Sequence, residues 1–264
     1  MAEPVAERVG FFTDTSVCIG CKACEVACKE WNGVPEDGLQ WLGTSYDNTG
    51  ALGASTWRHV AFIERPPAGG VADGAPGVEW LMSSDVCKHC THAACLDVCP
   101  TGSLFRTEFG TVVVQADICN GCGYCVPACP FGVIDKREDD GRAWKCTLCY
   151  DRLKDGMTPA CAQACPTTSI QFGPLDELRA RARQRVASLH SAGRTDARLY
   201  GDDPDDGVGG AAAFFLLLDQ PEVYGLPSDP VVTTRDLPQM WKAAGRAAAV
   251  FAVGVAAAFA GRRR

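Results

Sequence analysis

Hydrophobic and polar positions form a regular pattern in only a few stretches of this chain. From Pro174 to about His190 apolar residues recur at helical spacing, and Gly193 follows as a stop signal. The apolar face of this predicted helix comprises Leu175, Leu178, Ala182, Val186 and Leu189. Its arginines favour a solvated opposite face over contact with an acidic partner. The pattern therefore predicts one amphipathic surface helix in this region.

Short runs rich in β-branched and aromatic residues predict strands at residues 59–63, 111–114, 168–172 and 213–218. An acidic, glycine-rich loop is expected at 201–210, and an extended segment at 221–238. These elements cover a small part of the chain, so we expect low regular secondary structure elsewhere. The predicted fold class is α+β.

The C-terminal pattern is different, because residues 247–260 form a run of fourteen without a charge. If Arg246 snorkels, the run lengthens to the nineteen residues 243–261, close to the roughly 20 that cross a bilayer. Trp241 and Lys242 mark one interface and the arginines at 262–264 the other, so we predict a single C-terminal transmembrane helix. The positive-inside rule puts these arginines in the cytoplasm and the bulk of the chain on the outer face. The alternative to the outer face is the cytoplasmic face. The alternative to a transmembrane helix is a buried helix of a soluble protein.

Charge and the N-terminus narrow the possible functions. The formal net charge is −7, whereas nucleic-acid-binding proteins carry a basic excess, so no nucleic-acid partner is expected. Residues 1–12 have no basic n-region, apolar core or twin arginine. We therefore expect no signal peptide.

Sixteen cysteines, all in four tight groups, are the strongest feature of the composition. The groups are Cys18, Cys21, Cys24 and Cys28; Cys87, Cys90, Cys95 and Cys99; Cys119, Cys122, Cys125 and Cys129; and Cys146, Cys149, Cys161 and Cys165. Groups one and three have the spacing C-x2-C-x2-C-x3-C, and proline follows the last cysteine of groups two, three and four. This is the bacterial ferredoxin pattern, in which such thiolates bind iron–sulfur clusters. Small neighbours such as Gly20 and Gly121 allow close approach of the backbone.

The fourth thiolate of each group lies beyond the loop that carries the first three, and in two-cluster ferredoxins it ligates the other cluster. Groups two and three are close enough in sequence to form one module, which leaves groups one and four to pair across it. This pairing predicts four [4Fe–4S] clusters on four sets of cysteines. The sets are A (Cys18, Cys21, Cys24, Cys165), B (Cys146, Cys149, Cys161, Cys28), C (Cys87, Cys90, Cys95, Cys129) and D (Cys119, Cys122, Cys125, Cys99).

Zinc is the main alternative to iron–sulfur chemistry, because paired C-x-x-C units also form four-cysteine structural sites. Zinc ribbons present two such pairs separated by a longer loop, without a third and fourth cysteine before proline. Disulfides between cysteines two residues apart would close tiny loops and stabilise little. The spacing therefore favours iron–sulfur clusters.

The predicted organisation is two pseudo-symmetric bacterial ferredoxin-like modules, one inserted in the other. The first module combines residues 1–30 and 140–174, and the second comprises residues 85–139; each holds two clusters. Residues 31–84 form an insertion that covers a module, contacts a partner or is a plain surface loop. A helix and an extended, partner-contacting extension at 175–240 and the membrane anchor at 241–264 complete the chain.

Several stretches resemble a known family: CIGCKACEVACKEWN at 18–32, CKHCTHAACLDVCP at 87–100, CNGCGYCVPACPFG at 119–132 and PACAQACPTTSIQFG at 159–173. DQPEVYGLP at 219–227 and the final anchor extend the likeness to nearly the whole chain. On these residues the chain resembles the iron–sulfur (beta) subunit of membrane-bound respiratory formate dehydrogenase. The beta subunits of dimethyl sulfoxide, polysulfide and related molybdopterin reductases share the four-cluster layout.

This resemblance implies an electron-transfer subunit without catalytic residues of its own. Electrons would pass from a molybdopterin (molybdenum or tungsten) catalytic subunit that oxidises formate, through the clusters, to a membrane cytochrome b subunit that reduces quinone. The equivalent subunit of another molybdopterin reductase, or a soluble polyferredoxin, are the alternatives. His89 and His92, and Lys22, Lys88 and Lys145 beside ligands, are candidates for tuning clusters, although ordinary hydrogen-bonding histidines and surface lysines are the default interpretation.

Overall fold

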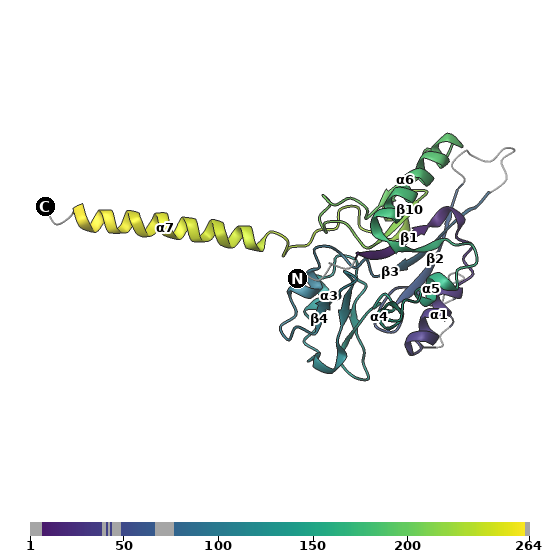
Figure 1. Ribbon diagram of the computed structural model, residues 1–264, viewed down its shortest axis with the longest axis horizontal. Helices are drawn as coiled ribbons and strands as arrows, with labels where there is room; N and C mark the ends of the chain where they lie inside the picture. Colours follow the sequence, from purple (N-terminus) through teal and green to yellow (C-terminus); the bar gives the residue numbers. More distant parts are fainter. Residues whose placement is uncertain (1–6, 39–40, 42, 44–48, 67–76, 262–264) are drawn as a thin grey trace.

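The computed structural model describes residues 7–38, 41, 43, 49–66 and 77–261 (Figure 1). Its strands are β1 (Val9–Asp14), β2 (Arg58–Arg65), β3 (Glu79–Val86), β4 (Leu104–Arg106), β5 (Val112–Val114), β6 (Asp135–Lys136), β7 (Ala143–Trp144), β8 (Ile170–Pro174), β9 (Arg198–Tyr200) and β10 (Ala213–Leu217). Its α-helices are α1 (Ala23–Asn32), α2 (Ala94–Asp97), α3 (Cys125–Ala128), α4 (Tyr150–Lys154), α5 (Ala160–Gln163), α6 (Leu175–Ser191) and α7 (Leu237–Gly261). The 3-10 helices of the described residues are η1 (Thr15–Val17), η3 (Ala116–Ile118) and η4 (Pro221–Tyr224). The predicted α+β class with low regular secondary structure is confirmed.

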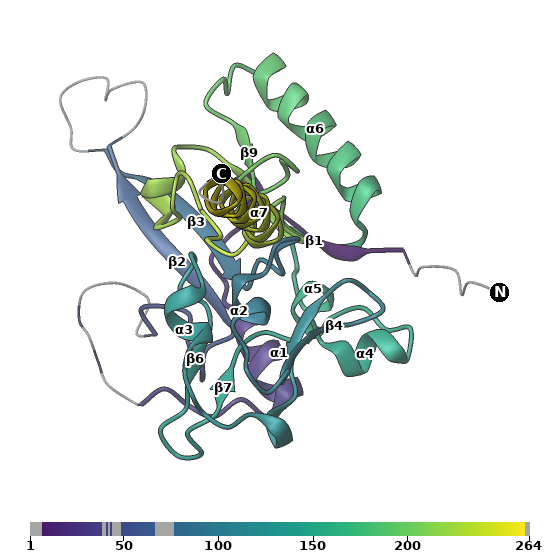
Figure 2. The same cartoon turned by 90° about the vertical axis from the view of Figure 1, so that its left-hand side faces the viewer.

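A four-stranded sheet in the order β8-β1-β10-β9 brings the first described strand beside the last. β1 is antiparallel to β8 and parallel to β10, where Phe12 pairs with Phe214 and their rings stack 5.4 Å apart. The predicted helix is α6, which lies beside β1 and β9 (Figure 2) and also packs on β8. It buries Leu175, Leu178 and Ala182. Strand β10 lies between β1 and β9, and every one of its residues is buried. Its last four residues pack in the same core as α6.

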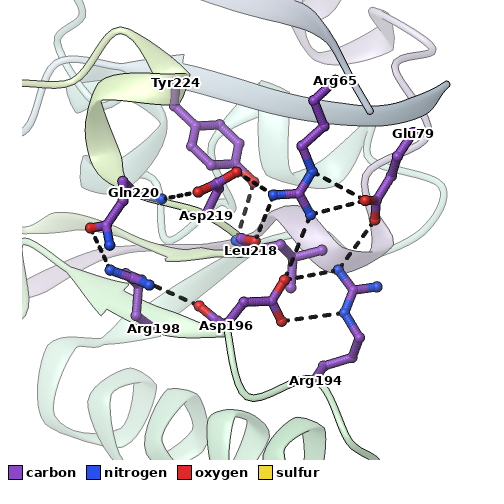
Figure 3. Close-up of polar contacts among 9 residues, drawn as sticks. All are labelled: Arg65, Glu79, Arg194, Asp196, Arg198, Leu218, Asp219, Gln220 and Tyr224. Carbon is purple, nitrogen blue, oxygen red and sulfur yellow. Dashed lines mark hydrogen bonds and ion pairs between the residues drawn. The ribbon is translucent and has the colours of Figure 1, made fainter. Parts of the chain in front are cut away.

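A long antiparallel hairpin, β2–β3, occupies the segment predicted as an insertion. The strand expected at 59–63 is confirmed as part of β2, while β3 was not predicted. Arg65 at the end of β2 pairs with Glu79 at 3.0 Å, with Asp196 at 3.6 Å and with Asp219 (Figure 3). Arg194 adds contacts with Glu79 and Asp196, so these ion pairs tie the hairpin to β9 and to the end of β10.

The cysteine-bearing part of the chain consists of short elements. Two-stranded sheets form from β4 with β5 and from β6 with β7. Helix α1 packs against α5, and α2 packs against α3. The strand predicted at 111–114 is confirmed as β5, and the one predicted at 168–172 is β8, which begins two residues later. The boundaries of the two predicted modules stay a prediction.

The segment after β10 is not simply extended, in contrast to the prediction for residues 221–238. Proline at 221 begins the 3-10 helix η4, and Gly225 ends it with φ of +72°. The chain then crosses to the second cysteine-rich region, where Val232 packs with Ala94 and Val208. Thr234 Oγ1 donates a hydrogen bond of 2.6 Å to Asp97 Oδ2. These contacts fix the point from which α7 leaves the body.

Helix α7 projects away from the rest of the protein (Figure 1). Within the described chain, residues Leu237–Ala260 are the one helix long and apolar enough to cross a membrane, and none of its most apolar window is buried. It starts before Trp241, the predicted interface residue. The arginines at 262–264, on which the predicted orientation depends, lie outside the described residues.

Candidate metal centres

All sixteen cysteines lie in the described part of the chain, and none of them forms a disulfide. The short helices carry several of them: Cys28 is on α1, Cys161 on α5, Cys95 on α2 and Cys125 on α3. Helix α1 packs against α5, and α2 packs against α3. Cysteine group one therefore lies beside group four, and group two lies beside group three.

Set A surrounds a small cavity near the protein surface. Cys18, Cys21, Cys24 and Cys165 all line this cavity. Burial raises the pKa of the Cys18 thiol, and the neighbouring Cys24, Cys165 and Cys21 thiolates raise it further. The structure thus brings Cys165 beside the cysteines near the N-terminus.

Set B is more deeply buried and has a polar side chain between two of its thiols. The Asn32 amide donates to Cys28 Sγ and to Cys149 Sγ, each at 3.8 Å. Burial raises the pKa of Cys28 to about 12, and the thiolates of Cys161 and Cys149 contribute to the shift. Cys146 has Cys28, Cys161 and Cys149 among its charged neighbours. Four thiols from two segments that are far apart in the sequence therefore lie together.

The part of the chain between groups one and four holds two further clusters of thiols, sets C and D. Burial raises the pKa of the Cys90 thiol well above its ordinary value, and its charged neighbours of the same set are Cys87, Cys129 and Cys95. Burial also raises the pKa of Cys125 to about 11, and its neighbouring thiolates are Cys119, Cys122 and Cys99. The four thiols of set C thus lie together, and so do the four thiols of set D.

Cysteines of successive sets are electrostatic neighbours, and these neighbours link the four sets in a row. Cys24 of set A has Cys161 of set B as a charged neighbour. Cys146 of set B has Cys87 of set C, and Cys95 of set C has Cys125 of set D. The order along the row is therefore A, B, C, D.

The backbone directly before the second cysteine of every group is left-handed. Gly20 and Gly121 occupy this position in groups one and three with φ of +66° and +71°. His89 and Leu148 occupy it in groups two and four with φ of +44° and +58°. A Cβ on Gly121 would lie 2.5 Å from the Gly141 carbonyl oxygen, so this site also requires glycine sterically. Such turns point successive N–H groups into one concavity, as in many iron–sulfur sites.

Two of the three lysines proposed beside ligands are not surface residues, so the default interpretation was wrong for them. Lys88 and Lys145 are each 1% exposed. Lys88 pairs with Asp85 and donates to the Val86 carbonyl at 2.9 Å. Lys145 donates to the backbone carbonyls of Val112 and Cys146. Burial opposes the charge of Lys145, yet the thiolates of Cys87, Cys95 and Cys146 raise its pKa above the ordinary value.

Lys22 is only partly exposed and pairs with Glu25 at 3.1 Å. His89 is fully buried, and its Nδ1 accepts a hydrogen bond of 3.1 Å from the Val112 N–H. The proton therefore resides on Nε2, which has no hydrogen-bond partner among the described residues. His89 thus combines a hydrogen-bonding role with an unused donor beside set C.

Two residues beside the sets, Asn32 and Arg58, were not predicted from the sequence. Asn32 lies one helical turn after Cys28, so the spacing on α1 contained the signal for its position. Arg58 is 1% exposed and lies beside sets A and B. Alternation along β2 puts it on the same face as buried Val60, but nothing in the sequence showed that this face meets the cysteines.

The donor chemistry of all four sets fits [4Fe–4S] clusters, which are held by four thiolates each. Two nitrogens of Arg58, Nε and Nη2, are buried without a partner among the described residues, as expected beside a cluster that supplies acceptors and negative charge. A zinc site needs thiolate sulfurs about 2.3 Å from one ion. Among the described residues, no three His, Cys, Asp or Glu side chains lie close enough together to hold a single metal ion.

Two family models for a 4Fe–4S dicluster domain match the chain, one at residues 17–103 and the other at residues 78–175. The nitrate-inducible formate dehydrogenase iron–sulfur subunit of Escherichia coli (strain K12) is 41% identical over 258 residues, which cover 96% of this chain and 83% of that protein. The formate dehydrogenase iron–sulfur subunit of Haemophilus influenzae is 42% identical over 247 residues, covering 91% and 75%. The B subunit of the anaerobic dimethyl sulfoxide reductase of Escherichia coli is 37% identical over 173 residues, covering 65% and 76%.

Fold, thiol sets and family models together define a ferredoxin-like electron-transfer protein that carries [4Fe–4S] clusters in dicluster domains. It is an electron-transfer subunit and not a catalyst on its own. The chain belongs to the family of formate dehydrogenase iron–sulfur subunits, as the resemblance predicted. The reductase alternative aligns over a smaller part of the chain.

Proposed function

We propose that this chain binds four [4Fe–4S] clusters, one on each of sets A to D, and relays electrons within a membrane-bound formate dehydrogenase complex. The observation that carries the proposal is the single row of four thiol sets in a member of this family. Each cluster, when bound, accepts and releases one electron. The residues of the chain hold the sets in order, bury the middle of the row and expose its ends.

The two ends of the row are open to partners. Cys21 of set A and Cys122 of set D are the exposed cysteines. Ile19 is 57% exposed and lies two residues before Cys21, and Tyr124 is 61% exposed and lies two residues after Cys122. Exposed apolar residues next to a ligand are suited to a subunit contact, because they are buried when the partner docks. Electrons therefore enter at one end and leave at the other.

The membrane anchor gives this row a direction. The segment that leads into α7 is held against α2 through Thr234 and Asp97, and Asp97 lies between Cys95 of set C and Cys99 of set D, the last set of the row. Set D consequently faces the membrane, where a cytochrome b subunit receives electrons for quinone. Set A faces a molybdopterin catalytic subunit, which oxidises formate to carbon dioxide, one proton and two electrons. The outer face of the membrane is our proposed side, from the arginines at 262–264.

Isolation of the native complex tests this function. We expect the chain to fractionate with membranes and to co-purify, without air, with a pterin-binding subunit and a multispan cytochrome that together couple formate oxidation to quinone reduction. A complex that reduces dimethyl sulfoxide or polysulfide and does not oxidise formate would assign the chain to a reductase instead. Recovery of the chain alone from the soluble fraction, with all its clusters, would support a polyferredoxin and contradict the proposal.

A further inference from the structure

Strand β2 carries an arginine at each end, and their surroundings differ sharply. Arg65 contacts three carboxylates, those of Glu79, Asp196 and Asp219, so its charge is balanced inside the protein (Figure 3). Arg58 forms no ion pair with any carboxylate of the described residues, although it is more deeply buried. A buried charge without a partner is strongly unfavourable, so the compensation for Arg58 must come from another source.

The contacts of Arg58 use only part of its guanidinium. Nη1 donates to the Ser84 carbonyl at 3.2 Å and to Ser84 Oγ at 3.0 Å. The guanidinium carbon lies 4.9 Å from the centre of the Phe11 ring. Nε and Nη2 have no hydrogen-bond partner among the described residues. Two buried donors and one full charge are therefore left over.

The charged groups around Arg58 are cysteines of two different sets. Cys161, Cys24, Cys146 and Cys28 are its electrostatic neighbours. All four side chains pack in one buried cluster with Phe11, whose ring lies against the guanidinium. Cys24 belongs to set A and the other three belong to set B. Ser84 strengthens the connection, because its Oγ lies 3.2 Å from Cys24 Sγ while it accepts the hydrogen bond from Arg58.

We propose that Arg58 is the shared counter-charge of the clusters on sets A and B. Its positive charge raises the reduction potentials of both clusters, because it stabilises an added electron on either one. The proposal rests on the proposed function, because it requires clusters on sets A and B. Four thiolates and an oxidised core carry a charge of about −2, which becomes about −3 when one electron is added. A fixed positive charge between two such groups favours the added electron on either and screens their mutual repulsion.

The test is a potentiometric titration, followed by electron paramagnetic resonance, of the complex purified without air. The substitution Arg58→Gln removes the charge and keeps a polar side chain. At a fixed potential we expect the reduced-to-oxidised ratio of clusters A and B to fall at least tenfold, or about 59 mV for a one-electron couple. Clusters C and D should not move, and Arg58→Lys should shift A and B less than Arg58→Gln does. The signal of cluster A is identified by its loss in Cys165→Ser.

Arg65→Gln is the matched control, because it removes the same charge from the same strand where carboxylates, not cysteines, surround it. It should leave all four potentials unchanged. Unchanged potentials of A and B in Arg58→Gln with normal iron content, or an equal shift in Arg65→Gln, would overturn the inference. If the Arg58→Gln complex does not assemble, Ser84→Ala tests the proposal in its place. We expect this variant to lower the reduction potential of cluster A more than that of cluster B. No shift, or an equal shift of both potentials, would contradict the proposal. A wild-type complex without iron would refute the proposed function, whereas a failed shift in an iron-replete variant refutes only the role of Arg58.

Discussion

The two cysteine-rich regions of this protein reach the same chemistry by different routes. In the outer region, residues 7–32 and 140–174, the sets depend on contacts between distant parts of the chain. Asn32 and Cys149, which meet at set B, are 117 positions apart, and β1 pairs with β8. In the inserted region, residues 85–139, the corresponding contacts are local, since β4 pairs with β5 and α2 packs on α3.

The two routes give different degrees of burial. Five cysteines of the outer region are buried: Cys24, Cys28, Cys146, Cys149 and Cys161. In the inserted region only Cys87 and Cys125 are buried. The hairpin β2–β3 accounts for much of this difference, because its Val60 and Val86 pack in the same core as four of these five cysteines, with Trp57 just before β2. The region built from distant segments thus has deeply buried thiol sets, which need a buried counter-charge. The region built from local contacts has more exposed thiol sets.

Loss of one ligand should separate the two regions most strongly. Cys165→Ser and Cys99→Ser each remove the fourth ligand of a set, so iron should fall from about sixteen to about twelve per chain in both. Cys165→Ser also removes a tie between distant segments, and we expect its apparent melting temperature to fall by at least about 5 °C more. Metal analysis with thermal unfolding of the anaerobic complex measures both effects.

The spectra of these two variants test the pairing of groups as well. Cys165→Ser should abolish the signal of the cluster on Cys18, Cys21 and Cys24. Damage confined to the cluster on Cys146, Cys149 and Cys161 would show that group four closes on itself and would contradict sets A and B. Equal loss of stability in both variants would remove the distinction between the two regions.

A smaller effect is expected at the junction of the regions, where Lys145 lies between sets B and C. Lys145→Gln removes a buried charge near Cys87 and Cys146, so the potentials of clusters B and C should fall, by about 59 mV for a tenfold change in ratio. Clusters A and D should keep theirs. Redox titration distinguishes this result from general damage, which would move all four clusters together.

The smallest effect belongs to the ion pairs that hold the hairpin on the outer region. Arg65→Gln removes contacts with Glu79, Asp196 and Asp219 at a partly exposed site, where such pairs contribute roughly 1 kcal/mol. We expect an apparent melting temperature about 2–4 °C lower at low salt, with less difference at high salt. A large fall that salt does not reduce would mean that the network stabilises by packing rather than by charge.

The sequence is informative wherever the chemistry depends on local spacing. The cysteine groups point to their cofactor, and short periodic runs predict the apolar face of α6 and the buried strand β10. Gly20 and Gly121 also stand out in the sequence, because small residues beside ligands indicate a constrained backbone.

Features that depend on contacts across the chain are not visible in the sequence. Strand β1 was not predicted, since its six residues become a strand only between β8 and β10. Surface positions are the default for Lys145 and Lys88 because a lysine is almost never fully buried without a partner, and the partners of Lys145 come in part from other segments. Arg58 gives no signal at all, because its role requires β2 to lie against two cysteine groups at once.

Iron and acid-labile sulfide analysis of the complex isolated without air, combined with its resonance spectrum after addition of formate, tests the central claim most directly. We predict about sixteen iron and about sixteen sulfide per chain, in clusters that formate reduces. Stoichiometric zinc in place of iron, or a full complement of clusters that formate leaves oxidised, would contradict this account.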